Sequence, residues 1–297
     1  MKVFVTGATG YVGSGIAAAL LAAGHQVFGM SRSAEKDAAL AKAGVRPLRG
    51  ALGNVKALAQ ELRGFDALVH AAVDYGLGAA ADREAIEALL AVARSSAAPT
   101  ALVYTSGVWV LGEAREPASE SASTAHPFAA VAWRPAHEQL VLSAGSERLA
   151  AAVIRPGIVY GERRGLLGSW YESALKEGRT AFVGPGSQRW AFVHRRDLGE
   201  LYRLVIERRA SGIFHGVDGA SPTVESAAAA VSRAAGKGGA TRAIPVEEAR
   251  KAMGPMADAL AGDQVVVSRR AAEVGWTPRH PPFSQDAAAA LKEWQGG

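Results

Sequence analysis

Three glycines spaced three residues apart form the motif with the clearest chemistry in this 297-residue sequence. They follow the apolar run at residues 2–6 directly, and an alanine-rich segment of helical spacing comes next. Such a loop permits a tight turn and a close approach of backbone to a pyrophosphate, and the following helix offers unpaired N–H groups to phosphate. We therefore predict a nucleotide-binding loop. Its predicted cofactor contacts are Gly7, Thr9, Gly10, Tyr11, Val12 and Gly13.

The end of the second predicted strand should carry the residue that reads the cofactor's ribose. The sequence there is Ser31-Arg32-Ser33, with no carboxylate before Glu35. A guanidinium forms charge-assisted hydrogen bonds with a phosphate, and the Ser31 hydroxyl can add another. This pattern predicts that NADP(H) is preferred over NAD(H). The alternative is an exposed loop arginine in an arginine-rich chain.

Composition excludes several classes of protein. Hydrophobic residues make up 49% and charged residues 21%, as in ordinary folded proteins. The net charge is +5 without a long basic run, so we expect no nucleic-acid partner. The chain has no cysteine, and it shows neither a metal-ligand motif nor an apolar run of about 18 residues. Residues 1–7 reach glycine too early for a signal peptide. We expect a cytoplasmic protein with no metal and no membrane partner.

The first half alternates short apolar runs with segments of helical spacing. The predicted strands are 2–6, 26–30, 45–48, 67–72, 101–106 and 151–155, and the predicted helices are 12–23, 34–43, 55–62, 83–95 and 135–144. This alternation predicts an α/β fold with a doubly wound parallel Rossmann sheet. Beyond residue 161 the predicted helices are 167–177, 223–235, 246–261 and 284–294, with one strand-like run at 212–217.

The sequence therefore divides into two predicted domains. Residues 1–160 form an NAD(P)-binding Rossmann domain, and residues 161–297 form a smaller C-terminal α+β substrate domain. The run at 212–217 is a candidate to return to the Rossmann sheet. No internal repeat is evident in the sequence.

Four further segments resemble a known family. They are His70-Ala71-Ala72, Tyr104-Thr105-Ser106-Gly107, residues 155–161 and residues 189–198. With the glycine loop, they are similar to the extended, epimerase/dehydratase-type branch of the short-chain dehydrogenase/reductase superfamily, over about residues 1–235. The resemblance implies hydride transfer between a nicotinamide cofactor and a carbon that bears oxygen. The further cofactor contacts that it implies are His70, Ala71, Ala72, Thr105, Ser106, Arg134, Pro156, Gly157 and Val159.

The sequence departs from the family at the catalytic residues. The family uses a Ser or Thr, a Tyr that moves the proton, and a Lys four residues later. None of the six tyrosines here is followed by Lys at that spacing. Aligned on Glu138, the Lys position falls on Arg134 and the Tyr position on Ala130. Aligned on Gly112, the hydroxyl position falls on Gly107, next to Ser106. Arg134 can orient a ribose or hold positive charge, but its pKa is too high for proton transfer.

Other residues must then supply the proton and hold the substrate. Related proteins suggest catalytic candidates at Ser106, Tyr160 and His194, with Tyr75 and Tyr171 as further proton donors. Aromatic residues in segments near the expected cleft predict a large apolar substrate pocket. These are Tyr75, Trp109, Trp133, Trp170 and Tyr171. The alternatives are a supporting role for His194 at the domain junction, and core packing for the tryptophans.

We predict an atypical NADP(H)-dependent oxidoreductase of this superfamily. It would transfer hydride to or from a small organic carbonyl, alcohol or activated double bond. One alternative is a catalytically silent NADP(H)-binding sensor or regulatory protein, which the missing Tyr/Lys pair would suit. Another is a nucleotide-sugar epimerase or dehydratase. The expected partner is a small-molecule substrate, and the sequence leaves a homodimer open.

Overall fold

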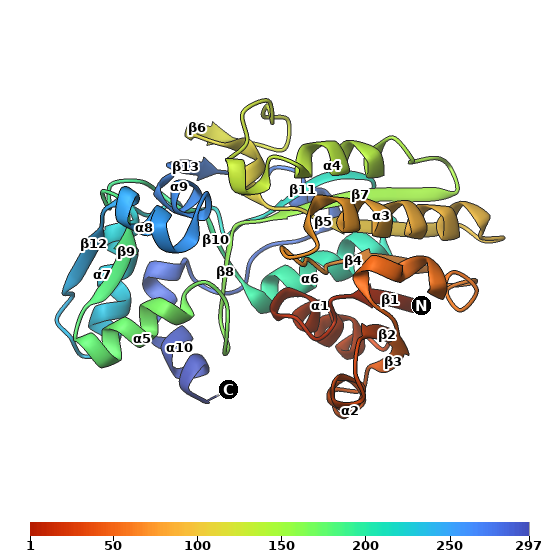
Figure 1. The fold of residues 1–297 in the computed structure, drawn as a ribbon, viewed down its shortest axis with the longest axis horizontal. Helices are drawn as coiled ribbons and strands as arrows, with labels where there is room; N and C mark the ends of the chain where they lie inside the picture. Colours follow the sequence, from red (N-terminus) through yellow and green to blue (C-terminus); the bar gives the residue numbers. More distant parts are fainter. Residues whose placement is uncertain (297) are drawn as a thin grey trace.

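The computed structural model describes residues 1–296, and its centre is a seven-stranded sheet in the order β11-β7-β5-β4-β1-β2-β3. All neighbouring strands in this sheet are parallel, so their carboxyl ends share one edge (Figure 1). The strands are β1 (Lys2–Thr6), β2 (Gln26–Ser31), β3 (Arg46–Arg49), β4 (Ala67–His70), β5 (Thr100–Thr105), β7 (Leu149–Pro156) and β11 (Gly212–Gly216). The predicted doubly wound α/β fold is confirmed.

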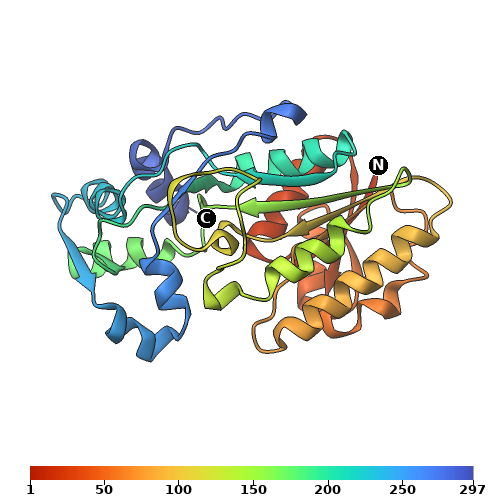
Figure 2. The same ribbon diagram turned by 90° about the horizontal axis from the view of Figure 1, so that it is seen from above.

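Alternation along the strands divides the core into two layers. Val3 and Val5 of β1 belong to one buried cluster, and Phe4 between them belongs to another. The first layer packs against α1 (Tyr11–Ala22), α2 (Ala34–Lys42) and α6 (Arg195–Glu207). The second packs against the 3₁₀ helix η1 (Leu52–Leu58), α3 (Gly78–Ser95) and α4 (Arg134–Leu142). Figures 1 and 2 show α3 and α4 together on one side of the sheet and α6 on the other.

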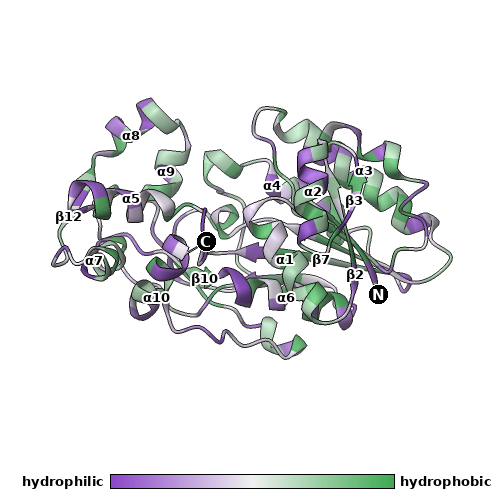
Figure 3. Ribbon diagram, turned by 90° about the horizontal axis from the view of Figure 1, so that it is seen from below, coloured by the Kyte–Doolittle hydropathy of each residue, from purple (hydrophilic) through white to green (hydrophobic). Residues whose placement is uncertain are grey.

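A second, smaller body lies beyond the carboxyl ends of the strands, and β7 points toward it (Figure 2). Its helices are α5 (Gly168–Glu177), α7 (Val224–Ala234), α8 (Val246–Met253), α9 (Met256–Ala261) and α10 (Phe283–Gly296), with β9 (Thr180–Val183) paired to β12 (Thr241–Ile244). Aromatic residues such as Trp170, Phe192 and Phe283 fill its core. Its outer helix α8 carries both hydrophilic and hydrophobic residues (Figure 3).

Short elements connect the two bodies. β8 (Ile158–Tyr160) pairs with β10 (Phe192–His194), and β6 (Ala114–Ala118) pairs with β13 (Gln264–Val266). The remaining 3₁₀ turns are η2 (Val108–Leu111), η3 (Ala129–Val131) and η4 (Ala271–Val274). The run at 212–217 is β11, which pairs with β7 in the central sheet.

Three sequence predictions for this architecture were wrong in detail. The helix predicted at 55–62 is the 3₁₀ segment η1, interrupted by the non-helical backbone of Asn54. The helix predicted at 246–261 is two helices, because Gly254 has a left-handed φ of 56° and Pro255 follows it. The strands of the small two-stranded sheets were not predicted as strands. They span three to five residues, and each pairs with a partner that is distant in the sequence.

Candidate functional site

The turn between β1 and α1 is packed so closely that it excludes side chains. Gly7 has a φ of 68°, and a Cβ built on it would lie 2.7 Å from the carbonyl oxygen of Ala71. A Cβ on Gly13 would lie 2.1 Å from the carbonyl oxygen of Gly7. The Gly10 N–H donates to that same oxygen at 2.7 Å. The three glycines therefore hold one bare backbone turn at the N-terminus of a helix, where phosphate oxygens can approach.

A cavity of about 290 Å³ lies beside this turn and is called the glycine-loop cavity. The predicted residues that line it are Gly7, Thr9, Gly10, Ser31, Arg32, Ala71 and Ala72. Lys36 and Arg164 also line it, so three cations face one carboxylate, that of Asp74. The Arg32 side chain is 59% exposed, and its Nη1 lies 3.4 Å from Asp74 Oδ2. The Ser31 hydroxyl donates to Asp37. The lining has an excess of positive charge.

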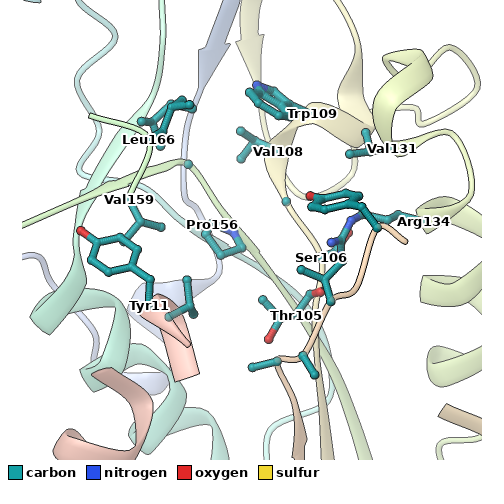
Figure 4. Close-up of a pocket in the computed structure, with 18 of the residues that line it drawn as sticks. Tyr11, Thr105, Ser106, Val108, Trp109, Val131, Arg134, Pro156, Val159 and Leu166 are labelled. Atoms are coloured by element: carbon teal, nitrogen blue, oxygen red, sulfur yellow. The ribbon is translucent and has the colours of Figure 1, made fainter. Parts of the chain in front are cut away.

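A second cavity of about 340 Å³, called the Ser106 cavity, adjoins the first at the sheet edge. Figure 4 shows residues that line it. The two cavities share Ala71, Ala72 and Val73. The predicted residues that line the Ser106 cavity are Tyr11, Val12, Ala71, Ala72, Tyr75, Thr105, Ser106, Trp109, Arg134, Pro156, Gly157 and Val159. Together the cavities form one groove across the carboxyl ends of the strands, which is the ligand-binding edge of open α/β sheets.

Ser106 and Arg134 are the polar centre of this cavity (Figure 4). Ser106 is 7% exposed, and its Oγ has no hydrogen-bond partner in residues 1–296. Arg134 is the first residue of α4, and its Nη1 donates to the carbonyl oxygen of Thr105 at 2.7 Å. The Thr105 hydroxyl is engaged differently, because it accepts a hydrogen bond from Tyr202. The free hydroxyl of Ser106 therefore follows directly on Thr105, whose carbonyl oxygen holds the guanidinium of Arg134 from α4.

A buried polar cluster lies behind Arg134. The carboxylate of Asp82 accepts hydrogen bonds from His137 at 2.7 Å and from the Tyr104 hydroxyl at 3.1 Å, and it lies 3.2 Å from His70 Nε2. Burial alone would raise the pKa of Asp82, but the hydrogen bonds from His137 and His70 hold it well below the ordinary value. The Tyr104 hydroxyl oxygen accepts in turn from Arg134 Nη1 at 3.4 Å. Asp82 therefore helps to fix the guanidinium.

The Asp82→Asn variant is expected to lower the free energy of unfolding by about 3 kcal/mol, because it breaks a buried, hydrogen-bonded charge cluster. Since the folded pKa of Asp82 is depressed, this stability is present at neutral pH and declines as the pH falls below about 4. Urea unfolding at several pH values measures it. Glu84→Gln, an exposed change on the same helix, is the control. Equal stability of the two variants would contradict the role of Asp82.

The structure places several predicted site residues outside both cavities. Tyr160 and His194 are 1% exposed, and they are held by Pro281 and Glu293 respectively. Burial raises the pKa of Tyr160 and lowers that of His194, so both stay neutral near pH 7. Neither is positioned for the proposed catalytic role, because each packs inside the junction between β8 and β10.

Some of the predicted substrate residues line the Ser106 cavity and others lie outside it. Trp170 and Tyr171 lie in the core of the smaller body, because their helix α5 turns this face toward α7 and α10. Trp133 packs over the guanidinium of Arg134, 4.5 Å from ring centroid to Cζ, and does not line the cavity. Only Tyr75 and Trp109 of the predicted substrate residues line it.

Two predicted cofactor contacts lie beneath the groove. Gly13 is inside α1, and His70 is buried between Thr6 and Asp82. The Thr6 hydroxyl oxygen accepts the N–H groups of Ala71 and Ala72, so its proton is donated to His70 Nδ1. His70 therefore supports the wall of the groove through Thr6 without lining it.

Sequence reasoning missed several lining residues, among them Lys36, Arg164, Leu166 and Met256. The sequence did contain a signal for Lys36. Ser33 caps α2 and accepts the N–H of Lys36, so this lysine lies one turn after Arg32. The other three come from the smaller body, and only the tertiary fold brings them over the sheet edge. The Arg164 backbone has a left-handed φ of 95°, and its Nη1 donates to Thr9 O at 3.3 Å.

Residues 1–296 contain neither a membrane-spanning helix nor a metal-binding cluster. None of the helices there combines the length and hydropathy that crossing a bilayer requires. The same range contains no cluster of three His, Asp or Glu side chains arranged to hold a metal ion.

Known proteins resemble this chain over most of its length. An uncharacterized protein of Schizosaccharomyces pombe is 30% identical, with 97% of this chain and 99% of the relative covered. A 4-hydroxy-2-methyl-3-oxo-4-farnesyl-3,4-dihydroquinoline-1-oxide ketoreductase of Stigmatella aurantiaca is 29% identical (85% and 78% covered), and a 2-alkyl-3-oxoalkanoate reductase of Stenotrophomonas maltophilia is 28% identical (71% and 67% covered).

A solved structure supports the fold. A human epimerase family protein, crystallised with NADPH, superposes with a TM-score of 0.81 at 20% identity, covering 98% of this chain and 99% of that one. The family model for the NAD dependent epimerase/dehydratase family matches residues 3–215. That match runs from β1 to β11, through every strand of the sheet that forms the groove, and the chain belongs to the NAD dependent epimerase/dehydratase family.

Proposed function

We propose that this protein is an NADP(H)-dependent oxidoreductase that reduces a ketone on a largely apolar substrate. The observation that carries the proposal is the Ser106 hydroxyl, buried and without a partner in residues 1–296, beside Arg134 in an otherwise apolar cavity. Buried polar atoms normally have a hydrogen-bond partner, so this hydroxyl is suited to an oxygen of a bound ligand. The Ser106 cavity also adjoins the glycine-loop cavity through Ala71, Ala72 and Val73, and a dinucleotide would extend across both.

The residues of the glycine-loop cavity fit an NADP(H) cofactor. The bare backbone of Gly7 and Gly10 and the N-terminus of α1 would hold its phosphates. The cations Arg32, Lys36 and Arg164 would hold the 2′-phosphate. When bound, NADP(H) supplies hydride chemistry at its nicotinamide ring.

The chain's own residues would then stabilise the oxygen of the substrate. Ser106 Oγ donates a hydrogen bond to the ketone oxygen, and the charge of Arg134 stabilises the negative charge that develops there. The Ser106 proton moves to that oxygen and is replaced from water at the cavity mouth. Tyr11 is a poor proton donor, because its hydroxyl already donates to Gly161 O at 2.6 Å and burial raises its pKa.

The lining of the Ser106 cavity supports an apolar substrate. Val108, Trp109, Val131, Leu166 and Met256 surround the polar centre. Two relatives of this chain have names that denote reduction of ketones bearing farnesyl or alkyl groups. A nucleotide sugar is disfavoured, because its two phosphate charges would meet one cation in the lining, that of Arg134.

The Arg32→Ala variant is expected to weaken NADPH binding about tenfold and to leave NADH binding unchanged. The reason is that a hydrogen bond between two charged groups is lost only with the 2′-phosphate. Fluorescence titration with both cofactors measures the effect. Arg94→Ala, an exposed change on α3 outside both cavities, is the control. If the wild-type protein binds NADPH and NADH equally well, the proposed preference is wrong.

Activity is tested by following NADPH oxidation against alkyl ketones, aldehydes, conjugated alkenes and nucleotide sugars, with cofactor binding measured in parallel. We expect turnover with alkyl ketones. Tight NADPH binding without turnover on any of these compounds would contradict the proposal and favour the sensor function, which the absent Tyr/Lys pair suits.

A further inference from the structure

Asp74 supplies the one carboxylate among the described residues that line the glycine-loop cavity. It follows β4, whereas Arg32 follows β2, and β1 lies between these two strands in the sheet. The two side chains therefore stand on opposite sides of the glycine turn at the end of β1. Ala71 and Ala72, shortly before Asp74, pack against Gly7 of that turn. The carboxylate thus lies beside the place where the adenosine ribose of a dinucleotide would follow its phosphates.

Backbone groups hold the Asp74 carboxylate in one orientation. Its Oδ1 accepts the N–H of Gly76 at 3.0 Å and that of Leu77 at 3.4 Å. Its Oδ2 has a single partner among the described residues, Arg32 Nη1, at 3.4 Å. Both side chains of this ion pair are partly exposed, and exposed ion pairs contribute little free energy. Oδ2 therefore remains available to a hydrogen-bond donor of a ligand in the cavity.

The carboxylates near the end of β2 are not placed for this role. A dinucleotide-binding sheet that reads the ribose hydroxyls of NAD(H) usually has its acidic residue there. In this chain Arg32 follows β2, and the nearby Asp37 accepts hydrogen bonds from Ser31 and Arg49 without lining the cavity. An acceptor for a ribose hydroxyl therefore has to come from the loop after β4.

We propose that Asp74 is a cofactor-specificity residue that lowers the preference of this protein for NADP(H) over NAD(H). With NAD(H), Oδ2 accepts a charge-assisted hydrogen bond from a ribose hydroxyl. With NADP(H), Arg32 binds the 2′-phosphate, and the carboxylate of Asp74 repels it. The cations Arg32, Lys36 and Arg164 outnumber Asp74, so the preference is reduced and not reversed. This inference rests on the cofactor site of the proposed function and is independent of the ketone.

The Asp74→Asn variant changes the cavity side of this residue and keeps its backbone side. The side-chain oxygen of asparagine can still accept the N–H groups of Gly76 and Leu77, so the turn is retained. The amide nitrogen then takes the place of Oδ2, and it donates hydrogen bonds instead of accepting them. It can bind a phosphate, but it cannot accept a ribose hydroxyl.

Fluorescence titration of the full chain with NADPH and with NADH measures both affinities. We expect Asp74→Asn to bind NADPH about three- to tenfold more tightly, because a charge repulsion is lost, and NADH about threefold more weakly, because a charged hydrogen bond is lost. Glu84→Gln, the same loss of charge at an exposed position outside both cavities, should change neither affinity. An NADPH/NADH affinity ratio in Asp74→Asn within about twofold of the wild-type ratio would overturn the inference.

Salt dependence distinguishes an electrostatic effect of Asp74 from a structural one. Repulsion between exposed charges is screened as the ionic strength rises, so the gain in NADPH affinity should shrink between about 0.05 M and about 0.5 M salt. A gain that does not change with salt would show that the variant acts through the turn, and it would also overturn the inference. If the wild-type protein binds neither cofactor, the proposed function fails, whereas an unchanged affinity ratio in Asp74→Asn refutes only the role of Asp74.

Discussion

Replacing Gly13 with alanine is expected to weaken NADPH binding roughly 10- to 100-fold, as overpacking at this site costs about 1–3 kcal/mol. The new Cβ would lie 2.1 Å from the carbonyl oxygen of Gly7 and 2.6 Å from its carbonyl carbon. Both are backbone atoms, so neither can rotate away. Gly7 itself cannot retreat, because it packs against the backbone of Ala71. The turn that forms the phosphate site must therefore shift.

Fluorescence titration with NADPH measures this effect, and circular dichroism shows whether the variant stays folded. Gly53→Ala is a matched control, because a Cβ at Gly53 meets nothing within 4 Å and its φ is not positive. Wild-type affinity in folded Gly13→Ala would show that the glycine turn does not form the cofactor site.

The Ser106→Ala variant is expected to lower kcat for ketone reduction about 100-fold or more, as loss of one oxyanion donor does in other enzymes. Its affinity for NADPH should stay within about twofold of the wild type, because in the proposed function the Ser106 hydroxyl binds the ketone oxygen and not the cofactor. The fold should also be retained, since the Oγ makes no hydrogen bond in residues 1–296.

Steady-state kinetics with an alkyl ketone, together with NADPH titration, measures the Ser106 effect. Ser143→Ala is the control, because Ser143 is exposed at the far end of α4 and bonds only Leu140 O. A Ser106→Ala enzyme with more than half of the wild-type kcat would show that the reacting oxygen is bound elsewhere.

Much of the lining of the glycine-loop cavity could be predicted from the sequence because its signals are local. The glycine turn lies between one strand and one helix, and Arg32 follows the next strand directly. The meeting of the strand ends at Thr105 and Pro156 could also be predicted, because parallel strands of one sheet end at the same edge. The position of Arg134 could be predicted by counting back from Glu138. The hydrogen bonds that fix its guanidinium could not be predicted.

The substrate half depends on contacts that are distant in the sequence. Trp170 and Tyr171 looked like pocket residues, but the side of α5 that carries them packs inward, and no local pattern shows which side faces the groove. Asp82 gave no signal either, because its partners His70 and His137 come from other elements. Leu166 and Met256 reach the cavity only after the smaller body docks at the sheet edge.

The most direct test of the account follows a labelled hydride. NADPH deuterated at nicotinamide C4, in each of its two stereochemical forms, is incubated with the protein and an alkyl ketone, and the alcohol is analysed by mass spectrometry and NMR. The account predicts deuterium on the carbinol carbon from one form only, with turnover lost in Ser106→Ala. Absence of deuterated alcohol, while NADPH binds tightly, would contradict the proposed reduction.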